Sequence, residues 1–123
     1  YGLMLDIMLP TVLSEGYFKN PLFPIDVMKQ TRQEANEDKQ ALFKLMRATK
    51  ERPDYRPELK KIATPTIIIQ GEKDTLFPVH MAQEVADSIP NSKLVVIPFA
   101  GHTLNLEAIP QMVKAMKEFI SFT

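Results

Sequence analysis

Asp74 and His102 are the two residues of this sequence whose types and spacing could perform chemistry. Asp74 follows a β-branched run that ends at Gln70, and His102 follows a second apolar run that ends at Ile97. If the two runs are adjacent parallel strands, their carboxyl ends bring both side chains to the same edge of a sheet. A carboxylate there would accept a hydrogen bond from one imidazole nitrogen and leave the other as a general base. We therefore predict that Asp74 and His102 are a catalytic acid and histidine.

Simpler interpretations exist for each of these residues. An Asp in a turn after a strand usually accepts hydrogen bonds from nearby amides, and a loop histidine is often only structural. Glu72 lies in the same loop as Asp74 and is the alternative acid. His80 falls outside the apolar stripe of the helix that follows, so we expect it to be exposed. The pairing of Asp74 with His102 favours the catalytic interpretation.

The second half of the chain contains the elements that must position this pair. The runs at 67–69 and 94–97 are typical of strands that are buried on both faces of a parallel sheet. A helix is predicted after Pro78, and a last helix from about Pro110. Strand, helix, strand, helix is the order of a βαβα unit with a right-handed crossover.

The first half reads as helices and loops. The segment 3–13 is apolar on nearly every side, as expected of a helix that is buried or whose partner lies outside this chain. An irregular connection is predicted over 16–24, then helices over 26–32 and 35–49. The helix over 35–49 carries an apolar stripe. We expect this stripe to pack in the core, with a lid or a partner-binding groove as alternatives. Its residues are Ala41, Leu42, Leu45, Met46 and Ala48.

Composition narrows the class of protein. The 123 residues are 45% hydrophobic and carry 15 basic and 15 acidic side chains, so no net charge attracts nucleic acid or an anionic membrane surface. There is no cysteine, no apolar run long enough for a membrane span, no Gly-rich phosphate loop and no His/carboxylate spacing typical of metal ligands. We expect a cytoplasmic protein without cofactor, metal, nucleic acid or membrane as partner.

The stretch 62–74, with Phe77 and Pro78 after it, resembles the penultimate strand and acid loop of the α/β-hydrolase family. Ala100-Gly101-His102, with Glu107 and Pro110, resembles that family's histidine loop and last helix, and the order of acid before histidine also agrees. The resemblance covers 59–123. The earlier residues resemble, less specifically, the helical cap of the esterase, enol-lactonase and C–C bond hydrolase group.

This resemblance implies an α/β protein with part of an α/β-hydrolase fold: a cap (lid) segment over 1–57 and a core βαβα unit with parallel strands over 58–123. It implies hydrolysis of a small ester, lactone or related carbonyl substrate. Four apolar side chains are predicted to bind that substrate, two beside the acid and the histidine and two under the lid: Phe77, Leu104, Met8 and Phe18.

The sequence departs from the family in its nucleophile. The family places a serine in a Gly-x-Ser-x-Gly elbow, and no serine of this chain has glycines at both positions. We therefore expect the nucleophile, whether Ser, Asp or Cys, in an N-terminal part of the same fold that is missing here; the absence of a starting Met agrees with truncation. Alone, the chain is predicted to be inactive and to form a homodimer. The alternative is an inactive self-associating fragment or interaction module.

Overall fold

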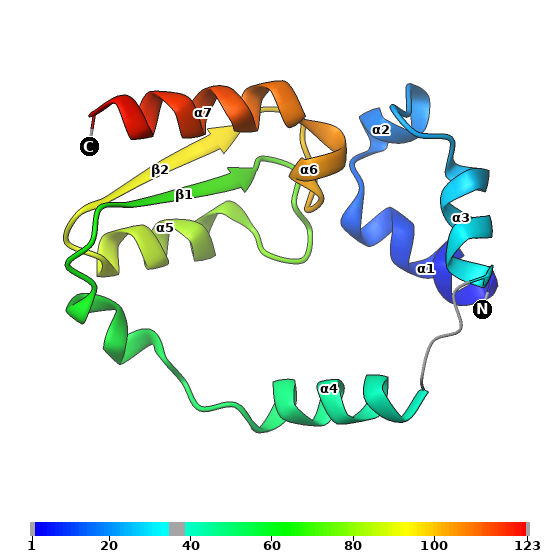
Figure 1. Ribbon diagram of the computed structural model, residues 1–123, viewed down its shortest axis with the longest axis horizontal. Helices are drawn as coiled ribbons and strands as arrows, with labels where there is room; N and C mark the ends of the chain where they lie inside the picture. Colours follow the sequence, from blue (N-terminus) through cyan, green and yellow to red (C-terminus); the bar gives the residue numbers. More distant parts are fainter. Residues whose placement is uncertain (1, 35–38, 123) are drawn as a thin grey trace.

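The computed structural model describes residues 2–34 and 39–122. Helices and two strands follow one another in the order α1 (Gly2–Val12), α2 (Glu15–Lys19), α3 (Ile25–Glu34), α4 (Lys39–Glu51), the 3-10 helix η1 (Arg56–Lys61), β1 (Thr66–Gly71), α5 (Val79–Ser88), β2 (Ser92–Ile97), α6 (Leu104–Glu107) and α7 (Ile109–Phe122). Helices α1 to α3 form a group beside the carboxyl edge of the sheet, and α4 connects this group to η1 (Figure 1).

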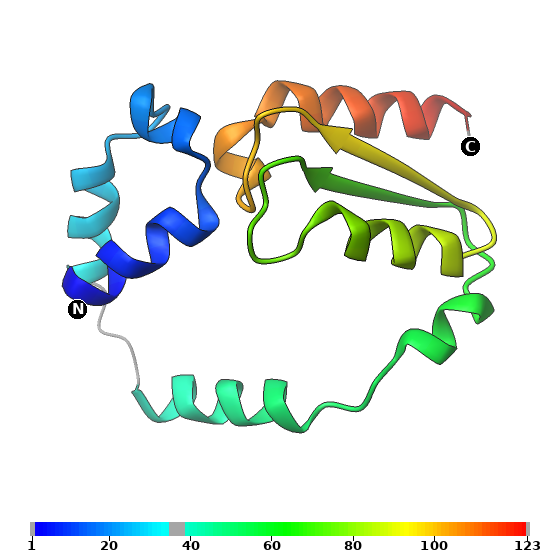
Figure 2. The same ribbon diagram turned by 180° about the vertical axis from the view of Figure 1, so that it is seen from behind.

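Strands β1 and β2 pair in parallel, with Thr66 opposite Ser92 and Gly71 opposite Ile97. Helix α5 makes the crossover between them and covers one face of the sheet, while α7 covers the other (Figures 1 and 2). The predicted βαβα order and the parallel pairing are therefore confirmed. Because the register aligns the two strand ends, the loops after Gly71 and Ile97 begin side by side.

A small core fixes these loops. Ile97, Ala100 and Ala108 are buried together, and three half-buried side chains pack against them: Ile69, Leu104 and Met112. On the other face, Ala82 and Ala86 of α5 are buried. The core thus lies directly behind the carboxyl ends of the strands, where it supports the predicted site.

The strands are less buried than the sequence predicted. Thr66 to Gln70 are only half-buried, and Val96 is exposed. The physical reason is the width of the sheet. In the part of the chain that the structure describes, each strand has one neighbour, so its outer edge is not covered by another strand.

The predicted helix over 3–13 forms α1, and the connection predicted as irregular contains the short helix α2. Leu9, Leu13 and Tyr17 form a second buried cluster. The Tyr17 hydroxyl lies within hydrogen-bonding distance of the Phe23 carbonyl (3.4 Å) and accepts a hydrogen bond from the Phe23 amide (3.1 Å). The Tyr17 hydroxyl therefore fixes the turn from α2 to α3.

The core packing that we expected for the stripe on α4 is wrong for its described side chains. Of the stripe residues, Leu45 is 65% exposed and Met46 is 59% exposed, and Ala41 and Ala48 are exposed too; their neighbour Phe43 is also exposed. Figure 1 shows α4 running apart from both the sheet and helices α1 to α3. The periodicity predicted the helix correctly, but no described element covers its apolar face. Residues 35–38 of the predicted helix lie outside the described residues.

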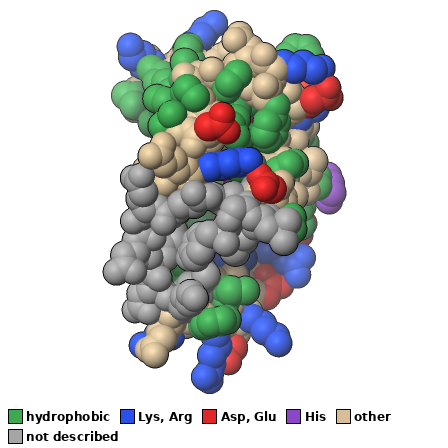
Figure 3. Space-filling view, turned by 90° about the vertical axis from the view of Figure 1, so that its right-hand side faces the viewer, with side chains coloured by type: hydrophobic (Ala, Val, Ile, Leu, Met, Phe, Trp, Pro, Cys, Tyr) green, Lys and Arg blue, Asp and Glu red, His purple; other side chains and the backbone are tan. Residues whose placement is uncertain are grey.

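Hydrophobic side chains also gather on the face formed by α1 to α3, most clearly in its upper part in Figure 3. The exposed large hydrophobic residues of this region are Ile7, Met8, Phe18, Leu22, Phe23 and Val27. Within 2–34 and 39–122, no helix has the length and apolar character that crossing a membrane requires.

Candidate catalytic site

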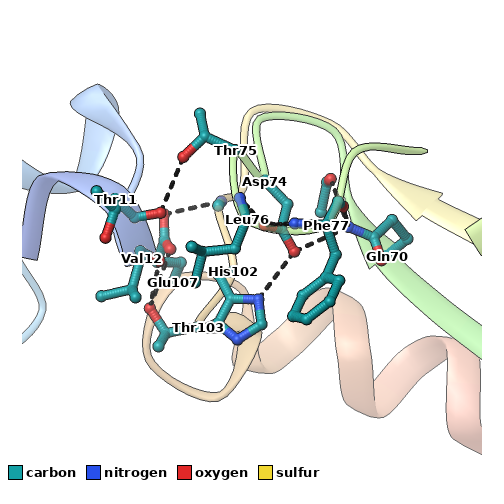
Figure 4. Close-up of polar contacts among 12 residues, drawn as sticks. Thr11, Val12, Gln70, Asp74, Thr75, Leu76, Phe77, His102, Thr103 and Glu107 are labelled. Carbon is teal, nitrogen blue, oxygen red and sulfur yellow. Dashed lines mark hydrogen bonds and ion pairs between the residues drawn. The ribbon is translucent and has the colours of Figure 1, made fainter. Parts of the chain in front are cut away.

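The structure brings Asp74 and His102 together at the carboxyl edge of the sheet. Asp74 Oδ2 lies 2.9 Å from His102 Nδ1, which is a hydrogen-bonding distance (Figure 4). Asp74 is buried, with 8% of its surface exposed, whereas the His102 side chain is 36% exposed. The hydrogen bond expected from the order of strands is therefore present. It links a buried carboxylate to an imidazole that reaches the surface.

The acid loop holds the Asp74 carboxylate through its own backbone. Asp74 Oδ1 accepts hydrogen bonds from the amides of Leu76 and Phe77, each at 2.9 Å. This is an Asx-type turn, the structural role that a lone Asp after a strand most often has. The two roles are compatible because Oδ1 makes the turn and Oδ2 contacts the imidazole.

Gln70, the last side chain before Gly71, supports the same carboxylate. Its Nε2 donates to Asp74 Oδ2 at 2.9 Å and to the Phe77 carbonyl at 2.7 Å. Asp74 Oδ2 therefore has two partners, Gln70 and His102, and the whole carboxylate has four. An ionised carboxylate can accept all four hydrogen bonds.

These contacts determine the ionisation of Asp74. Burial opposes the charged form, but the hydrogen bonds from Phe77, His102 and Gln70 together outweigh it, so the pKa of Asp74 lies below its ordinary value. Asp74 is thus ionised at neutral pH and can only accept. His102 Nδ1 is therefore the donor in this hydrogen bond, and in a neutral imidazole this arrangement leaves Nε2 with its lone pair.

Gly71 allows the acid and histidine loops to approach closely. A Cβ atom on Gly71 would lie 2.1 Å from the Gly101 carbonyl oxygen and 2.6 Å from that of Ala100. The loops are also joined by backbone hydrogen bonds, from Glu72 N to Ile97 O at 2.9 Å and from Lys73 N to Ala100 O at 2.8 Å. The short distance between Asp74 and His102 depends on this approach.

The C-terminal end of α1 contacts both loops. The Val12 carbonyl accepts hydrogen bonds from the amides of His102 (3.0 Å) and Thr103 (3.2 Å), and the Thr75 hydroxyl donates to the Thr11 carbonyl at 2.9 Å (Figure 4). The last carbonyls of a helix have no partner within the helix. Here they bind the loops that carry the acid and the histidine, so the first helix is part of the site.

The four predicted substrate-binding residues have different surroundings. The Phe77 ring lies 5.6 Å from the His102 ring, measured between centroids, and Phe77 is 51% exposed. Leu104 packs instead against the buried cluster of Ile97. Met8 and Phe18 are exposed side chains on α1 and α2. A role in binding substrate stays a prediction for all four.

The alternative acid, Glu72, has a different partner. Its Oε2 accepts a hydrogen bond from the Phe99 amide at 3.0 Å, and this bond, with the charge of Lys73, lowers the pKa of Glu72 below its ordinary value. Phe99 has a φ of 63°, which is unfavourable for a bulky side chain. Glu72 therefore holds the strained turn after β2, while Asp74 makes the contact with His102.

Ser14 has a glycine on one side but valine where the second glycine of an elbow would lie. Its Oγ caps α2 by accepting a hydrogen bond from Tyr17 N at 3.3 Å, and its own amide donates to Glu107 at 2.9 Å. Within 2–34 and 39–122, no group of three or more His, Asp or Glu side chains is placed to hold a metal ion.

Sequence reasoning did not foresee the parts played by Gln70, Glu107 and the Val12 carbonyl. A signal existed for Gln70, because it is the polar residue that ends a β-branched run at the carboxyl edge of the predicted sheet. Glu107 has a signal only in the resemblance of 100–110 to the family's histidine loop. The Val12 carbonyl leaves no trace in the sequence, because every residue has one.

Comparison with known families agrees with this geometry. The model of the alpha/beta hydrolase fold family matches residues 19–109. The chain belongs to the α/β-hydrolase fold family.

Particular relatives match parts of the chain. A protein named carbamate hydrolase RutD, from Pseudomonas syringae pv. syringae, is 32% identical over 68 residues, which are 55% of this chain and 26% of that protein. Over 68 residues the chain is also 32% identical to 2-hydroxy-6-oxo-6-(2'-aminophenyl)hexa-2,4-dienoic acid hydrolase of Metapseudomonas resinovorans, covering 54% of this chain and 23% of that protein.

Solved structures match almost the whole chain. An esterase from Thermogutta terrifontis superposes with a TM-score of 0.77 at 28% identity, covering 98% of this chain and 43% of that chain. The enol-lactonase from Burkholderia xenovorans superposes with a TM-score of 0.80 at 22% identity, covering 97% of this chain and 44% of that chain. The chain therefore spans less than half of each of these structures and about a quarter of the relatives that it matches in sequence.

Proposed function

We propose that this chain supplies the acid, Asp74, and the histidine, His102, of a nucleophile–His–acid triad in a hydrolase. The single observation that carries the proposal is the contact of Asp74 Oδ2 with His102 Nδ1 at 2.9 Å, made by a buried and ionised carboxylate. The substrate is a small ester, lactone or related carbonyl compound. Relatives named as carbamate and dienoic acid hydrolases, and the esterase structure of 28% identity, support this substrate class.

In the proposed reaction His102 Nε2 takes the proton of a nucleophile as the nucleophile attacks the carbonyl carbon. Asp74 keeps the imidazole in the required tautomer and stabilises the imidazolium that forms. The proton then passes to the leaving group, and water releases the acyl group by the same steps in a second round. No serine here has the elbow sequence, so we assign the nucleophile and the oxyanion donors to an N-terminal part of the same fold.

Within this proposal residues 1–57 are the cap and residues 58–123 the core. The hydrogen bonds from the His102 amide and the Thr75 hydroxyl to the end of α1 support this division, because they place the first helix beside the site. Phe77 lines the substrate pocket next to the imidazole. Met8 and Phe18 contribute its apolar cover.

The test uses an enzyme in which this chain is joined to a nucleophile-bearing part. Asp74→Asn should lower kcat by ~10⁴-fold and His102→Ala by ~10⁶-fold, as the loss of the acid or the histidine of a triad does elsewhere. Glu72→Gln is the matched control, since Glu72 bonds to Phe99 and not to His102. If Glu72→Gln abolished activity while Asp74→Asn kept it, the acid assignment would be wrong.

The chain alone should hydrolyse nitrophenyl acetate no faster than free imidazole does, because oxyanion donors alone are worth ~10²–10³ in rate. A burst of nitrophenolate with an acylated chain detected by mass would contradict the assignment of the nucleophile to another part.

A second candidate is an inactive, self-associating chain. The observation that favours it is the exposure of Phe43, Leu45 and Met46 on α4, together with the outer edges of β1 and β2. We propose a homodimer for the chain alone. Sedimentation equilibrium at micromolar concentration distinguishes the outcomes, because a monomer mass with cooperative unfolding contradicts self-association.

A further inference from the structure

We propose that Glu107 is a positioning residue for His102. Its carboxylate ties the histidine loop to the junction between α1 and α2, residues 12–14, and so holds the imidazole against Asp74. The effect of Glu107 on catalysis rests on the proposed function, whereas its effect on the orientation of His102 can be measured in the chain itself.

The Glu107 carboxylate contacts the residues on both sides of the histidine. Its Oε2 accepts a hydrogen bond from the amide of Gly101 at 3.0 Å, and its Oε1 accepts one from the hydroxyl of Thr103 at 3.2 Å. The same Oε2 accepts the amide of Ser14 at 2.9 Å. One carboxylate therefore joins both neighbours of His102 to a segment from the other half of the chain.

The Val12 carbonyl completes this attachment. It accepts the amides of His102 and Thr103 and the Thr103 hydroxyl, the last at 3.1 Å. The His102 backbone is thus bonded to the α1–α2 junction, while its Nδ1 is bonded to Asp74. With the backbone and one ring nitrogen both fixed, the imidazole has one preferred direction.

The carboxylate has little freedom to move. A Cβ atom on Gly101 would lie 2.7 Å from Glu107 Oε1 and 2.7 Å from Ser14 N, so the loop packs directly on the carboxylate. Helix α6 begins immediately after Thr103, and the Glu107 amide donates to the Thr103 carbonyl at 3.0 Å. Because α6 is a single turn, the Glu107 side chain lies against the histidine loop that precedes this helix.

Two partners of the carboxylate, the amides of Gly101 and Ser14, can only donate, while the single proton of the Thr103 hydroxyl lies within reach of both Glu107 Oε1 and the Val12 carbonyl. A glutamine of the same size can accept from the two amides, but only as a neutral group. Hydrogen bonds to a carboxylate are stronger than those to an amide. Glu107→Gln should therefore loosen the histidine loop without a change in volume.

The first experiment measures the imidazole directly. Long-range ¹H–¹⁵N spectra of the chain at neutral pH should show His102 mainly as the Nδ1–H tautomer in the parent. In Glu107→Gln the Nδ1 proton signal should weaken and the Nε2–H form should increase. Glu118→Gln is the matched control, since Glu118 is an exposed residue on α7 that pairs only at the surface with Lys114. Unchanged His102 signals in a folded Glu107→Gln chain would overturn the proposal.

If Glu107→Gln does not fold, Thr103→Val replaces it, because this change removes only the hydroxyl that bonds Glu107 and Val12. A smaller shift of the tautomer ratio in the same direction is expected. A folded Thr103→Val chain with parental His102 signals would overturn the proposal equally.

The second experiment uses the enzyme that contains a nucleophile-bearing part. Glu107→Gln should lower kcat by ~10- to 100-fold, the effect of a catalytic group misplaced by about 1 Å, with KM nearly unchanged. A parental kcat, or a loss confined to KM, would refute the positioning role. If His102→Ala left activity intact, the proposed function would fail, yet the tautomer measurement would still decide the structural part.

Discussion

Replacement of Asp74 by asparagine is the most direct test of how the site is built. The carboxylate accepts four hydrogen bonds, each at 2.9 Å: two at Oδ1 from backbone amides and two at Oδ2 from Gln70 and His102. Asparagine can keep the first two through its oxygen. Its NH₂ group then faces two donors, so the second pair of contacts cannot survive unchanged.

The loss of stability caused by Asp74→Asn follows from the hydrogen bonds that must then rearrange. If Gln70 rotates its amide to present oxygen, the Phe77 carbonyl loses a donor that now lies at 2.7 Å. The Phe77 carbonyl makes an exposed contact and can bond to water, whereas the Asp74 side chain is only 5% exposed, so solvent does not replace the contacts that the carboxylate itself loses. A hydrogen bond to a buried charge contributes about 1.5–3 kcal/mol, and the loss of one such bond should lower the free energy of unfolding by this amount.

His102 can accept a hydrogen bond from the asparagine NH₂ only at an unprotonated Nδ1, so its own proton must move to Nε2. This is the tautomer that cannot act as a base, so ~10⁴-fold of turnover should be lost in a complete enzyme. Urea unfolding followed by circular dichroism measures the first effect, and ¹⁵N chemical shifts of His102 measure the second. A parental free energy of unfolding together with the Nδ1–H tautomer would refute the reasoning.

The same substitution has a defined pH dependence. The pKa of Asp74 in the folded chain lies below its ordinary value of about 3.9 in an unfolded chain. Its contribution to stability is therefore complete above about pH 3.9 and is lost as the pH falls through the folded pKa. The difference in free energy of unfolding between the parent and Asp74→Asn should shrink on acidification in that window. A difference that stays constant from pH 7 to pH 2 would contradict the assignment of the lowered pKa.

Three further changes test two loops beside the site and one ion pair away from it. Gly71→Ala should lower the free energy of unfolding by about 1–3 kcal/mol or more, because its Cβ would lie 2.1 Å from the Gly101 carbonyl oxygen, and backbone must move; a parental urea midpoint would contradict the close approach. Phe99→Gly should raise the free energy of unfolding by up to about 1 kcal/mol, because it removes a left-handed Phe that is 77% exposed, and a decrease would show that the ring makes a needed contact. Asp54 should titrate with a pKa of about 2, because its hydrogen bonds to Arg56 favour the ionised form; ¹³C spectra of the carboxyl group measure this, and Arg56→Gln should return the pKa toward 3.8.

The part of the fold that sequence predicted well is the part governed by local pattern. The β-branched run at Ile67 and the spacing of Ala82 and Ala86 determine a strand and a helix almost independently of their surroundings. The parallel order then follows from chain connectivity. Because parallel strands end at the same edge, the hydrogen bond between Asp74 and His102 could be predicted from their positions after the two strands.

The prediction failed where burial depends on what else is present. The apolar stripe on α4 specifies a helix face, but nothing in its sequence states which surface covers that face, and Met46 is exposed. The attachment of α1 to the site was also not predictable. It depends on the Val12 carbonyl and on a carboxylate at Glu107, and a backbone carbonyl or a single acid carries no pattern that distinguishes it.

The hydrogen bonds of the site also imply an order of folding. Asp74 and His102 are separated by 28 residues within one βαβ unit, whereas Ser14 and Glu107 are separated by 93. Closing a longer loop costs more chain entropy, and contacts between distant residues tend to form late. We therefore expect the acid–histidine contact to form with the sheet, before the α1–α2 junction docks. Substitutions at Glu107 should then mainly accelerate unfolding, while substitutions in β1 should slow folding.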